Sequence, residues 1–177
     1  MTWILSAEPA HSADAVDTLY AYTHEVASRW YGREATDAEV RPYVPSPREL
    51  HAPRGRLFLA RSLVGPAPGQ LASRTGPVAR LAAEISGCVA VHLLRPGLAE
   101  LKRLWVVPDQ RGGGLGDLLV HRAEQVAHEE WGARSIRLDT RADLVEARTL
   151  YARRGYHEIP RYNDAQYAAH WLEKTFA

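Results

Sequence analysis

The sequence predicts an α/β (α+β) fold in which a mixed sheet carries helices on both faces. Along the 177 residues, candidate elements follow one another as strand, helix, helix, several strands, helix, strand, helix and strands. This order is typical of a sheet that is covered by helices on each side. The segment from Leu101 to Leu138 has the pattern strand, helix, strand, so its two strands are expected to be parallel with a right-handed connection. No internal repeat is present, and residues 1–177 are expected to form one domain.

Capping residues mark the first elements. A short strand is expected at Thr2–Leu5, ahead of Ser12, whose side chain can cap a helix. Apolar residues then recur at a helical period until Gly32, a residue type that commonly ends helices. The spacing of Thr36 and Glu39 is that of a capping box, which predicts a second, short helix.

Strand-like runs alternate with turns in the middle of the chain. Strands are expected at Leu57–Ala60 and Ile85–Leu94. The segment Val64–Val78 between them is rich in Gly, Pro and Ser, which predicts an exposed loop. Pro96-Gly97 is expected to turn the chain into a further strand over Ala99–Val107.

A helix is predicted from Gly114 to Trp131, because apolar residues in this segment fall on one face. Those residues are Leu115, Leu118, Leu119, Ala123 and Val126. His121, Glu124 and His128 also lie at helical spacing, and three such side chains could in principle face one ion. Their face is opposite the apolar one, and no H-E-x-x-H motif is present. We therefore expect a solvated helix face and no metal site.

The C-terminal part continues with alternating strands and one helix. Ser135–Thr140 alternates apolar and polar residues, as a strand with one buried face does. Leu144–Arg154 is helical in pattern, with Gly155 at the position where a left-handed residue ends many helices. The last strands are expected within Tyr156–Ile159 and Tyr167–Phe176.

The composition excludes several functional classes. A net charge of +1 gives no overall field for nucleic acid or an anionic membrane, and no basic stripe with interleaved aromatic residues is present. No apolar run approaches the roughly 20 residues that cross a bilayer. The single cysteine, Cys88, excludes an intrachain disulfide and is expected to be a small core residue. With no basic leader before an apolar stretch, these features indicate a cytoplasmic protein without nucleic acid or membrane partners.

One turn between a strand and a helix has a distinctive composition. It has the sequence Arg111-Gly112-Gly113-Gly114-Leu115-Gly116. The first turn of a helix exposes unpaired amides and partial positive charge, and glycines allow close approach, so a phosphate can bind there. A Walker motif is absent, and residue 117 is Asp where the dinucleotide fingerprint has its third glycine. The alternative interpretation is a merely tight turn.

Two motifs resemble the signature of the GNAT superfamily of N-acetyltransferases. The first is Arg111-x-x-Gly114-x-Gly116 after Val106-Val107-Pro108-Asp109. The second is the helix-then-strand segment Ala147–Tyr156, which is similar to A-x-x-L-Y-x-x-x-G-[FY]. The resemblance implies a mostly antiparallel central sheet of six to seven strands, about four helices on both faces, and splaying at the central parallel strands. It also implies acetyl-CoA as cosubstrate.

The resemblance assigns coenzyme contacts to individual residues. It implies that backbone groups of Leu104, Trp105 and Val106 pair with the pantetheine arm. It also implies that the amides of Arg111, Gly112, Gly113, Gly114, Leu115 and Gly116 hold the pyrophosphate. The residues themselves add that Leu101 and Leu104 differ in parity, which predicts a bulge between them. The alternative is a strand that is buried on both faces.

Catalysis of acyl transfer needs a neutral amine and a protonated leaving thiol. The resemblance implies that Tyr151 is the acid toward sulfur and that Glu100 is the base, acting directly or through water. The alternatives are a Tyr151 that packs on the sheet and a solvated Glu100 that pairs with Lys102 or Arg103. Glu84 and Asp139 are rival bases. Where many relatives have asparagine, this chain has Leu144, so Thr140 or Arg141 would replace that contact.

The expected reaction is transfer of an acetyl group to a primary amine of a small molecule, by direct attack in a ternary complex. The alternatives are a peptide or protein amine, a longer acyl group, and a non-catalytic CoA-binding sensor. Late aromatic residues are candidates for an acceptor pocket, for strand packing or for the contact of a homodimer. They are Tyr156, Tyr162, Tyr167 and Trp171.

Overall fold

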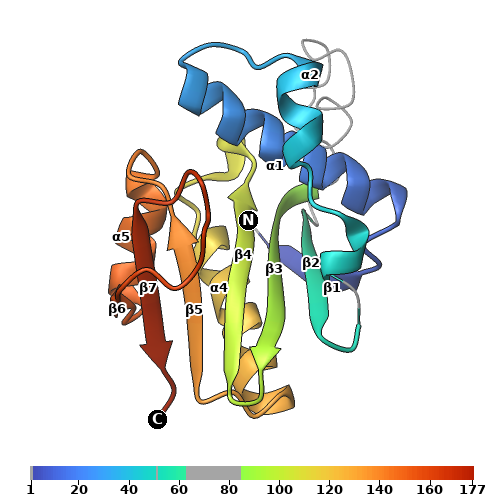
Figure 1. Ribbon diagram of the computed structural model, residues 1–177. Helices are drawn as coiled ribbons and strands as arrows, with labels where there is room; N and C mark the ends of the chain where they lie inside the picture. Colours follow the sequence, from blue (N-terminus) through green and yellow to red (C-terminus); the bar gives the residue numbers. More distant parts are fainter. Residues whose placement is uncertain (1, 51, 63–84) are drawn as a thin grey trace.

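The computed structural model describes residues 2–50, 52–62 and 85–177, and it is built on one seven-stranded sheet (Figure 1). The strand order is β1-β2-β3-β4-β5-β7-β6. The β4–β5 pair is parallel, and every other pair is antiparallel. Four α-helices accompany the sheet in the described part of the chain. The predicted mixed, mostly antiparallel sheet and its parallel central pair are confirmed.

The first elements begin and end at the capping residues. β1 spans Trp3–Glu8, and α1 spans Ala13–Tyr31. The Ser12 side chain accepts a hydrogen bond from the Ala15 amide at 3.1 Å, and Gly32 ends α1 with a φ of 66°. The capping box at Thr36 is present and begins α2, which spans Asp37–Val40.

Short 3-10 helices at Arg41–Tyr43 and Pro47–Leu50 lead into the next strands. β2 spans Gly55–Ser62, β3 spans Ile85–Arg95, and β4 spans Leu98–Val106. The predicted strands and the turn between β3 and β4 are therefore confirmed. The predicted loop over residues 64–78 and the candidate base at position 84 lie outside the described residues.

The central helix is α4, which spans Leu115–Gln125 and continues as a π-helix over Val126–Glu130. Two predictions about its faces are wrong. Leu118 is exposed, because it lies outside the sector that turns toward the sheet. Glu124 is buried rather than solvated, because α5 and the last strand cover that side and supply Arg154 and Lys174 as partners.

The remaining elements follow the predicted order. β5 spans Ser135–Thr140, and α5 spans Val145–Arg153. Gly155 follows α5 with a φ of 87°, as expected for a helix that ends in a left-handed residue. β6 spans His157–Glu158, and β7 spans His170–Thr175. No helix among the described residues is both long enough and apolar enough to cross a bilayer.

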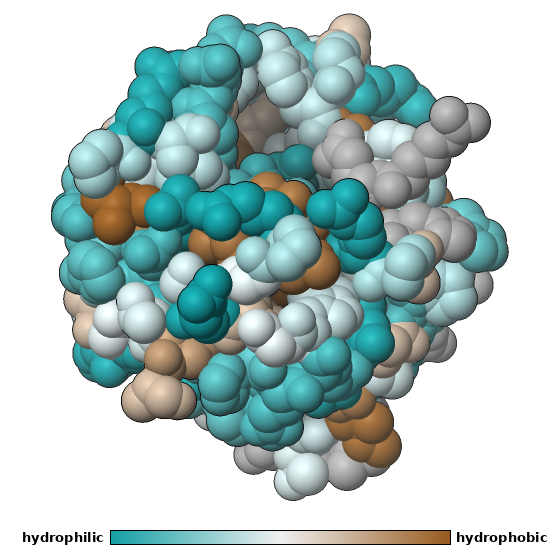
Figure 2. Space-filling view, turned by 60° about the horizontal axis from the view of Figure 1, so that its bottom comes forward, coloured by the Kyte–Doolittle hydropathy of each residue, from teal (hydrophilic) through white to brown (hydrophobic). Residues whose placement is uncertain are grey.

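Two apolar cores lie on opposite faces of the sheet. α4 and α5 cover one core, which includes Leu119 and Ile136. α1 covers the other, which includes Leu19 and Cys88, and burial raises the pKa of the Cys88 thiol to about 12. In Figure 1, α1 crosses the top of the sheet and α4 lies behind the strands. The surface in Figure 2 is mainly hydrophilic, with small separate hydrophobic spots, so apolar residues on this side are concentrated in the interior.

β4 contains the predicted bulge. Between Lys102 and Trp105, three residue steps on β4 face two steps on β3. Arg103 has a φ of 57°, a conformation that is uncommon for any residue except glycine. Leu104 consequently packs against the same core as Leu101, whereas Trp105 belongs to the opposite core. The bulge restores the inward phase of the strand, as the parity of the two leucines indicated.

β4 and β5 separate after Glu100, just before the bulge, and this splaying of the parallel strands was predicted. They pair over three residue pairs, which begin at Leu98–Ser135 and end at Glu100–Arg137. β4 then runs on to Val106, and β5 runs on to Thr140, without further pairing to each other. The splayed ends of the two strands open the interior of the sheet toward the glycine turn and α1.

Candidate active site

The candidate site begins at the glycine turn between β4 and α4. Gly112 and Gly114 have φ angles of 78° and 91°, in the left-handed region that favours glycine. Within the described part of the chain, the amides from Gly112 to Gly116 donate no hydrogen bond to the protein. Unpaired donors at the start of a helix, where the dipole is positive, suit a phosphate or another anion. The turn therefore has the donor geometry that the sequence predicted.

Arg111 differs from the glycines that follow it. Its amide donates to the Pro108 carbonyl at 3.2 Å, so the run of available amides is shorter by one than predicted. Its side chain donates from Nε to the Val106 carbonyl at 2.9 Å and forms an ion pair with Glu25 of α1. The second Glu25 oxygen accepts a hydrogen bond from Trp105 Nε1 at 2.8 Å. Glu25 thus lies beside the turn and neutralises the Arg111 guanidinium with a carboxylate of the protein itself.

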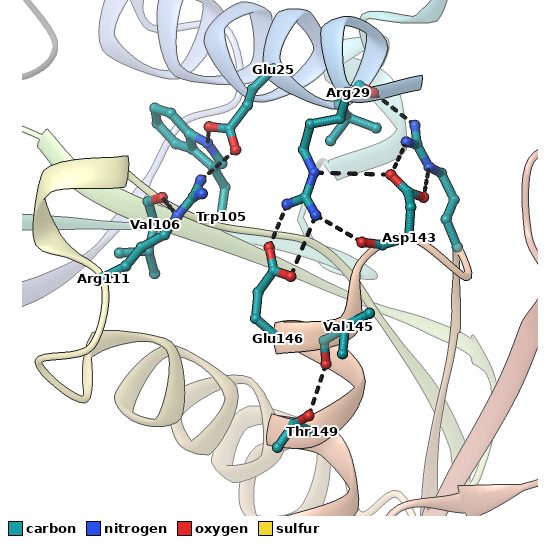
Figure 3. Close-up of polar contacts among 11 residues, drawn as sticks. Glu25, Arg29, Trp105, Val106, Arg111, Asp143, Val145, Glu146 and Thr149 are labelled. Atoms are coloured by element: carbon teal, nitrogen blue, oxygen red, sulfur yellow. Dashed lines mark hydrogen bonds and ion pairs between the residues drawn. The ribbon is translucent and has the colours of Figure 1, made fainter. Parts of the chain in front are cut away.

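A second set of ion pairs joins α1 to the start of α5 (Figure 3). Arg29 forms an ion pair with Glu146, and its Nη2 donates to the Asp143 carbonyl at 2.8 Å. The Arg29 guanidinium lowers the pKa of the Glu146 carboxyl, and Arg141 lowers the pKa of Asp143. In Figure 3, Glu25 and Arg29 point from α1 toward the turn and α5. Alternating charges therefore bridge the space between these elements.

A cavity of about 1030 Å³ connects these parts. β4 and the glycine turn line one side, α5 and the end of β5 line another, and α1 and residues 165–168 complete the wall. The predicted coenzyme residues Leu104, Trp105 and Val106 all line the cavity, and so does the catalytic candidate Tyr151. Leu144, where asparagine was expected, also lines it. The splay of β4 from β5 thus leads from the free amides to the part of the cavity that Asp139 and Tyr167 line.

Tyr151 presents its side chain to the cavity from α5. Its ring packs 5.6 Å from the Tyr156 ring, centroid to centroid, and only 5% of the residue is exposed. Burial, followed by the nearby Tyr22 and Asp139, raises the pKa of the phenol above its usual range. No hydrogen bond joins the hydroxyl to another residue in the described ranges. The group is therefore a protonated donor at the cavity wall, which fits the predicted acid.

Glu100 lies in a buried polar network and is not solvated. One oxygen is 2.7 Å from His92 Nε2 and 3.4 Å from the Lys102 ammonium, and the other accepts from Tyr162 at 2.7 Å. Burial alone would raise the pKa of Glu100, but the His92 ring, Lys102 and Tyr162 outweigh that effect and lower it. Glu100 is 3% exposed and is not part of the cavity wall. The predicted pairing with Lys102 is confirmed, and direct contact with an acceptor is disfavoured by this geometry.

Asp139, the rival candidate at the end of β5, does line the cavity. Its Oδ1 accepts from Asn163 Nδ2 at 2.8 Å and lies 3.5 Å from the Lys102 ammonium. Trp171 Nε1 donates to the Asn163 side-chain oxygen at 2.8 Å and thereby orients the amide. Asn163 and Lys102 each contact both carboxylates, because Asn163 Nδ2 is also 3.5 Å from Glu100. The two acidic candidates therefore belong to one network, with Asp139 at its cavity end.

The late aromatic residues do not form one cluster. Tyr156 packs in the core, Tyr162 bonds to Glu100, and Trp171 bonds to Asn163. Tyr167 alone among the four lines the cavity. The packing interpretation therefore holds for Tyr156, and Tyr167 is the one of the four that stays a candidate for an acceptor pocket.

Sequence reasoning missed the residues that α1 and the loop before β7 contribute. They are Glu25, Arg29, Trp30 and Asn163. Their partners are far away in the sequence, and no local pattern marked them. The described residues contain no group of three or more His, Cys, Asp or Glu placed to hold a metal ion.

Comparisons with known proteins agree with this geometry. Residues 42–156 match the model of the Acetyltransferase (GNAT) family. Over 77 residues, the chain is 44% identical to an uncharacterised N-acetyltransferase of Schizosaccharomyces pombe, which covers 43% of this chain and 47% of that protein. The chain thus matches about half the length of this relative.

Solved structures share the fold. One is a GNAT-family acetyltransferase from Staphylococcus aureus Mu50, with a TM-score of 0.72, 13% identity, and coverage of 98% of this chain and 99% of that one. Another is the PaiA N-acetyltransferase of Thermoplasma acidophilum in complex with coenzyme A. Its TM-score is 0.66 at 14% identity, with coverage of 99% and 100%. At these identities, the likeness shows the fold alone.

Proposed function

Because the chain belongs to the GNAT family of acetyltransferases, we propose that it transfers an acetyl group from acetyl-CoA to a primary amine of a small molecule, by direct attack in a ternary complex. One observation carries this proposal. A single cavity joins the unpaired amides of the glycine turn to a protonated Tyr151 and to the Asp139 carboxylate. Anion binding, proton donation and proton acceptance therefore lie within reach of one pair of substrates.

In this proposal, the amides from Gly112 to Gly116 bind the coenzyme pyrophosphate. The Arg111 side chain leaves Glu25 and adds charge-assisted hydrogen bonds to the same group. The edge of β4 that no longer pairs with β5 offers the backbone of residues 104–106 to the pantetheine arm. The Val106 carbonyl becomes available once Arg111 moves, because both contacts involve the same guanidinium.

The proposed reaction forms a C–N bond and breaks a C–S bond. The acceptor ammonium first loses a proton, and its nitrogen then attacks the thioester carbonyl carbon. Tyr151 donates its hydroxyl proton to the departing sulfur. The nitrogen loses a second proton as the amide forms. One of the two nitrogen protons restores Tyr151, and the other leaves to solvent, so the products are an amide and a free thiol.

The structure separates the two acidic candidates by position, and we propose different roles for them. Asp139 lines the cavity and can accept a proton from the amine directly or through one water. Glu100 is buried with both oxygens engaged, and its lowered pKa makes it a weak base. Glu100 is therefore a positioning residue that holds Lys102 and Asn163 against Asp139. Its predicted role as base would require a relay through that network.

The alternatives have less support. A non-catalytic sensor needs no acid in the cavity, whereas Tyr151 lies there with an unengaged hydroxyl. A peptide or protein acceptor would have to pass α1 and residues 165–168, which line the acceptor end. A homodimer and a cytoplasmic location remain predictions from the sequence.

The test is release of free thiol from acetyl-CoA with a panel of primary amines. Tyr151→Phe should reduce kcat by about 100-fold, as expected for loss of a general acid, and the KM for acetyl-CoA should change less than threefold. Tyr156→Phe is the matched control, because its ring packs on Tyr151 but does not line the cavity. Equal rates for Tyr151→Phe and wild type would remove Tyr151 from the acid role. Tight CoA binding without thiol release for any amine would instead favour the sensor.

A further inference from the structure

Three aromatic side chains from different elements meet at the acceptor end of the cavity. Trp30 lies in the last turn of α1, Tyr43 ends a 3-10 helix, and Tyr167 lies in the loop before β7. The ring centroids of Trp30 and Tyr167 are 5.1 Å apart in an edge-to-face arrangement, and those of Tyr43 and Tyr167 are 5.7 Å apart. The Tyr167 hydroxyl donates to the Tyr43 hydroxyl at 3.1 Å. We call these three residues the aromatic wall.

The aromatic wall is ordered but not covered. Trp30 is 53% exposed and Tyr43 is 47% exposed, although both line the cavity. The edge-to-face contacts among the three rings cover only part of each ring. The remaining apolar ring surface is accessible from the cavity. A flat apolar group that packs on this surface removes it from water without the cost of ordering the rings first.

The charges around the wall decide which group fits. The Arg141 guanidinium lies 5.2 Å from the Trp30 ring centroid and is held there by Asp143 and by the Val26 carbonyl. The Arg103 guanidinium, 5.9 Å from the ring of Tyr22, lies elsewhere along the cavity, because Tyr22 is close enough to Tyr151 to raise its pKa. A cation of the protein therefore already occupies the position over Trp30 that a second positive charge on the acceptor would take by cation–π attraction. A neutral ring is favoured over an ammonium at this end.

The carboxylate at the other end of the acceptor space completes the pattern. Asp139 lines the same cavity as the aromatic wall and faces the region of Tyr151, whose pKa it raises by its charge. Asp139 can therefore form an ion pair with one ammonium group of the acceptor, and the aromatic wall can pack against an apolar ring of the acceptor. The Ala169 amide donates to the Thr140 carbonyl at 2.9 Å, so the loop of Tyr167 lies beside the strand end that carries Asp139, and a short linker lets one molecule reach both.

We propose that the acceptor is a primary amine joined to an aromatic ring by a short alkyl linker, with no second positive charge. The proposal rests on the proposed acetyl transfer, and it makes Trp30 and Tyr167 the residues that determine specificity. Neutral aliphatic amines are poorer acceptors because they offer less flat surface to the rings. Diamines are the poorest because their second ammonium meets the Arg141 guanidinium over Trp30.

The test compares phenethylamine, n-hexylamine and cadaverine at saturating acetyl-CoA. The KM for phenethylamine should be at least tenfold below that for cadaverine and about threefold below that for hexylamine. Trp30→Ala and Tyr167→Ala should each raise the KM for phenethylamine about 3- to 10-fold, the usual worth of an aromatic pair, and leave kcat within a factor of three. Trp131→Ala is the control, because Trp131 is partly buried and does not line the cavity.

Binding of the same amines to the CoA-loaded protein, measured by calorimetry, keeps the two proposals apart. If no amine releases thiol but phenethylamine binds most tightly, acetyl transfer fails and the acceptor ranking stands. If thiol is released and cadaverine has the lowest KM, acetyl transfer stands and the aromatic acceptor is refuted. An equal rise in KM for all three amines in Trp30→Ala and Tyr167→Ala would likewise refute it, because the wall would then only close the cavity.

Discussion

Replacing Glu25 with Gln should tighten the binding of acetyl-CoA. Glu25 neutralises Arg111, the side chain that is proposed to meet the pyrophosphate. Coenzyme binding must therefore break this ion pair before Arg111 can move. A Gln side chain keeps an oxygen for the Trp105 indole but removes the charge, so the competing interaction is weakened while the packing stays the same.

The size of the expected change in acetyl-CoA affinity follows from the solvent exposure of the Glu25–Arg111 ion pair. The Glu25 side chain is 23% exposed and that of Arg111 is 36% exposed, so solvent screens the pair. Pairs of this kind contribute about 0.5–1 kcal/mol, which corresponds to a decrease of roughly 2- to 5-fold in the Kd for acetyl-CoA. The negative charge that Glu25 places near the incoming phosphates acts in the same direction.

Isothermal titration of wild type and Glu25→Gln with acetyl-CoA measures this difference directly. The difference should shrink when salt is raised from about 50 to 500 mM, because both the ion pair and the phosphate contacts are screened. Glu130→Gln is the control, because Glu130 pairs with Arg56 and Arg122 and does not line the cavity. Weaker binding in Glu25→Gln would refute the argument and show that Glu25 orients Arg111 for the coenzyme.

Two further predictions concern the frame of the site. Glu124→Ala should lower the free energy of unfolding by about 3 kcal/mol in urea titrations, because Arg154 and Lys174 would lose a buried partner. Burial alone would raise the pKa of Glu124, but these two cations lower it; its contribution is therefore complete above about pH 4.5 and should fade as the pH drops through the folded pKa. An unchanged difference between wild type and variant at pH 3 would contradict this sign. Gly87→Ala should weaken acetyl-CoA binding and cost about 1–3 kcal/mol of stability in thermal melts, because the added Cβ would lie 2.4 Å from the Trp105 carbonyl oxygen beside the bulge. A variant with wild-type melting and affinity would show that β4 can shift without loss.

Local signals in the sequence predicted much of the fold. The caps at Ser12 and Thr36, the turn at Gly155 and the bulge between Leu101 and Leu104 each depend on residues a few positions apart. The glycine turn and Tyr151 could also be predicted, because motifs of fixed spacing mark them. Each of these features depends on residues within one strand, one helix or one turn, so it can be predicted from a short segment of sequence.

Features that depend on distant partners could not be predicted. Glu124 has the helical position of a solvated residue, and it is buried because Arg154 and Lys174 lie 30 and 50 residues away in the sequence. Glu25 reaches Arg111 across 86 residues. The positions of Glu100 and Asp139 could be told apart only from the tertiary structure, in which Asp139 lines the cavity and Glu100 does not. Residue type and spacing identified the candidate site residues, but which of them are buried and which line the cavity depends on tertiary packing.

The short junction between β4 and β5 has a mechanical consequence. Strands β1 to β4 form one part of the sheet and β5 to β7 form the other. Three residue pairs between β4 and β5 are the strand pairing that joins the two parts. A molecule that binds between the splayed ends and contacts both parts of the sheet adds contacts where the strand pairing is missing. Its binding would hold the two parts in a fixed relative position, so the rigidity of the whole sheet would rise and fall with each catalytic cycle.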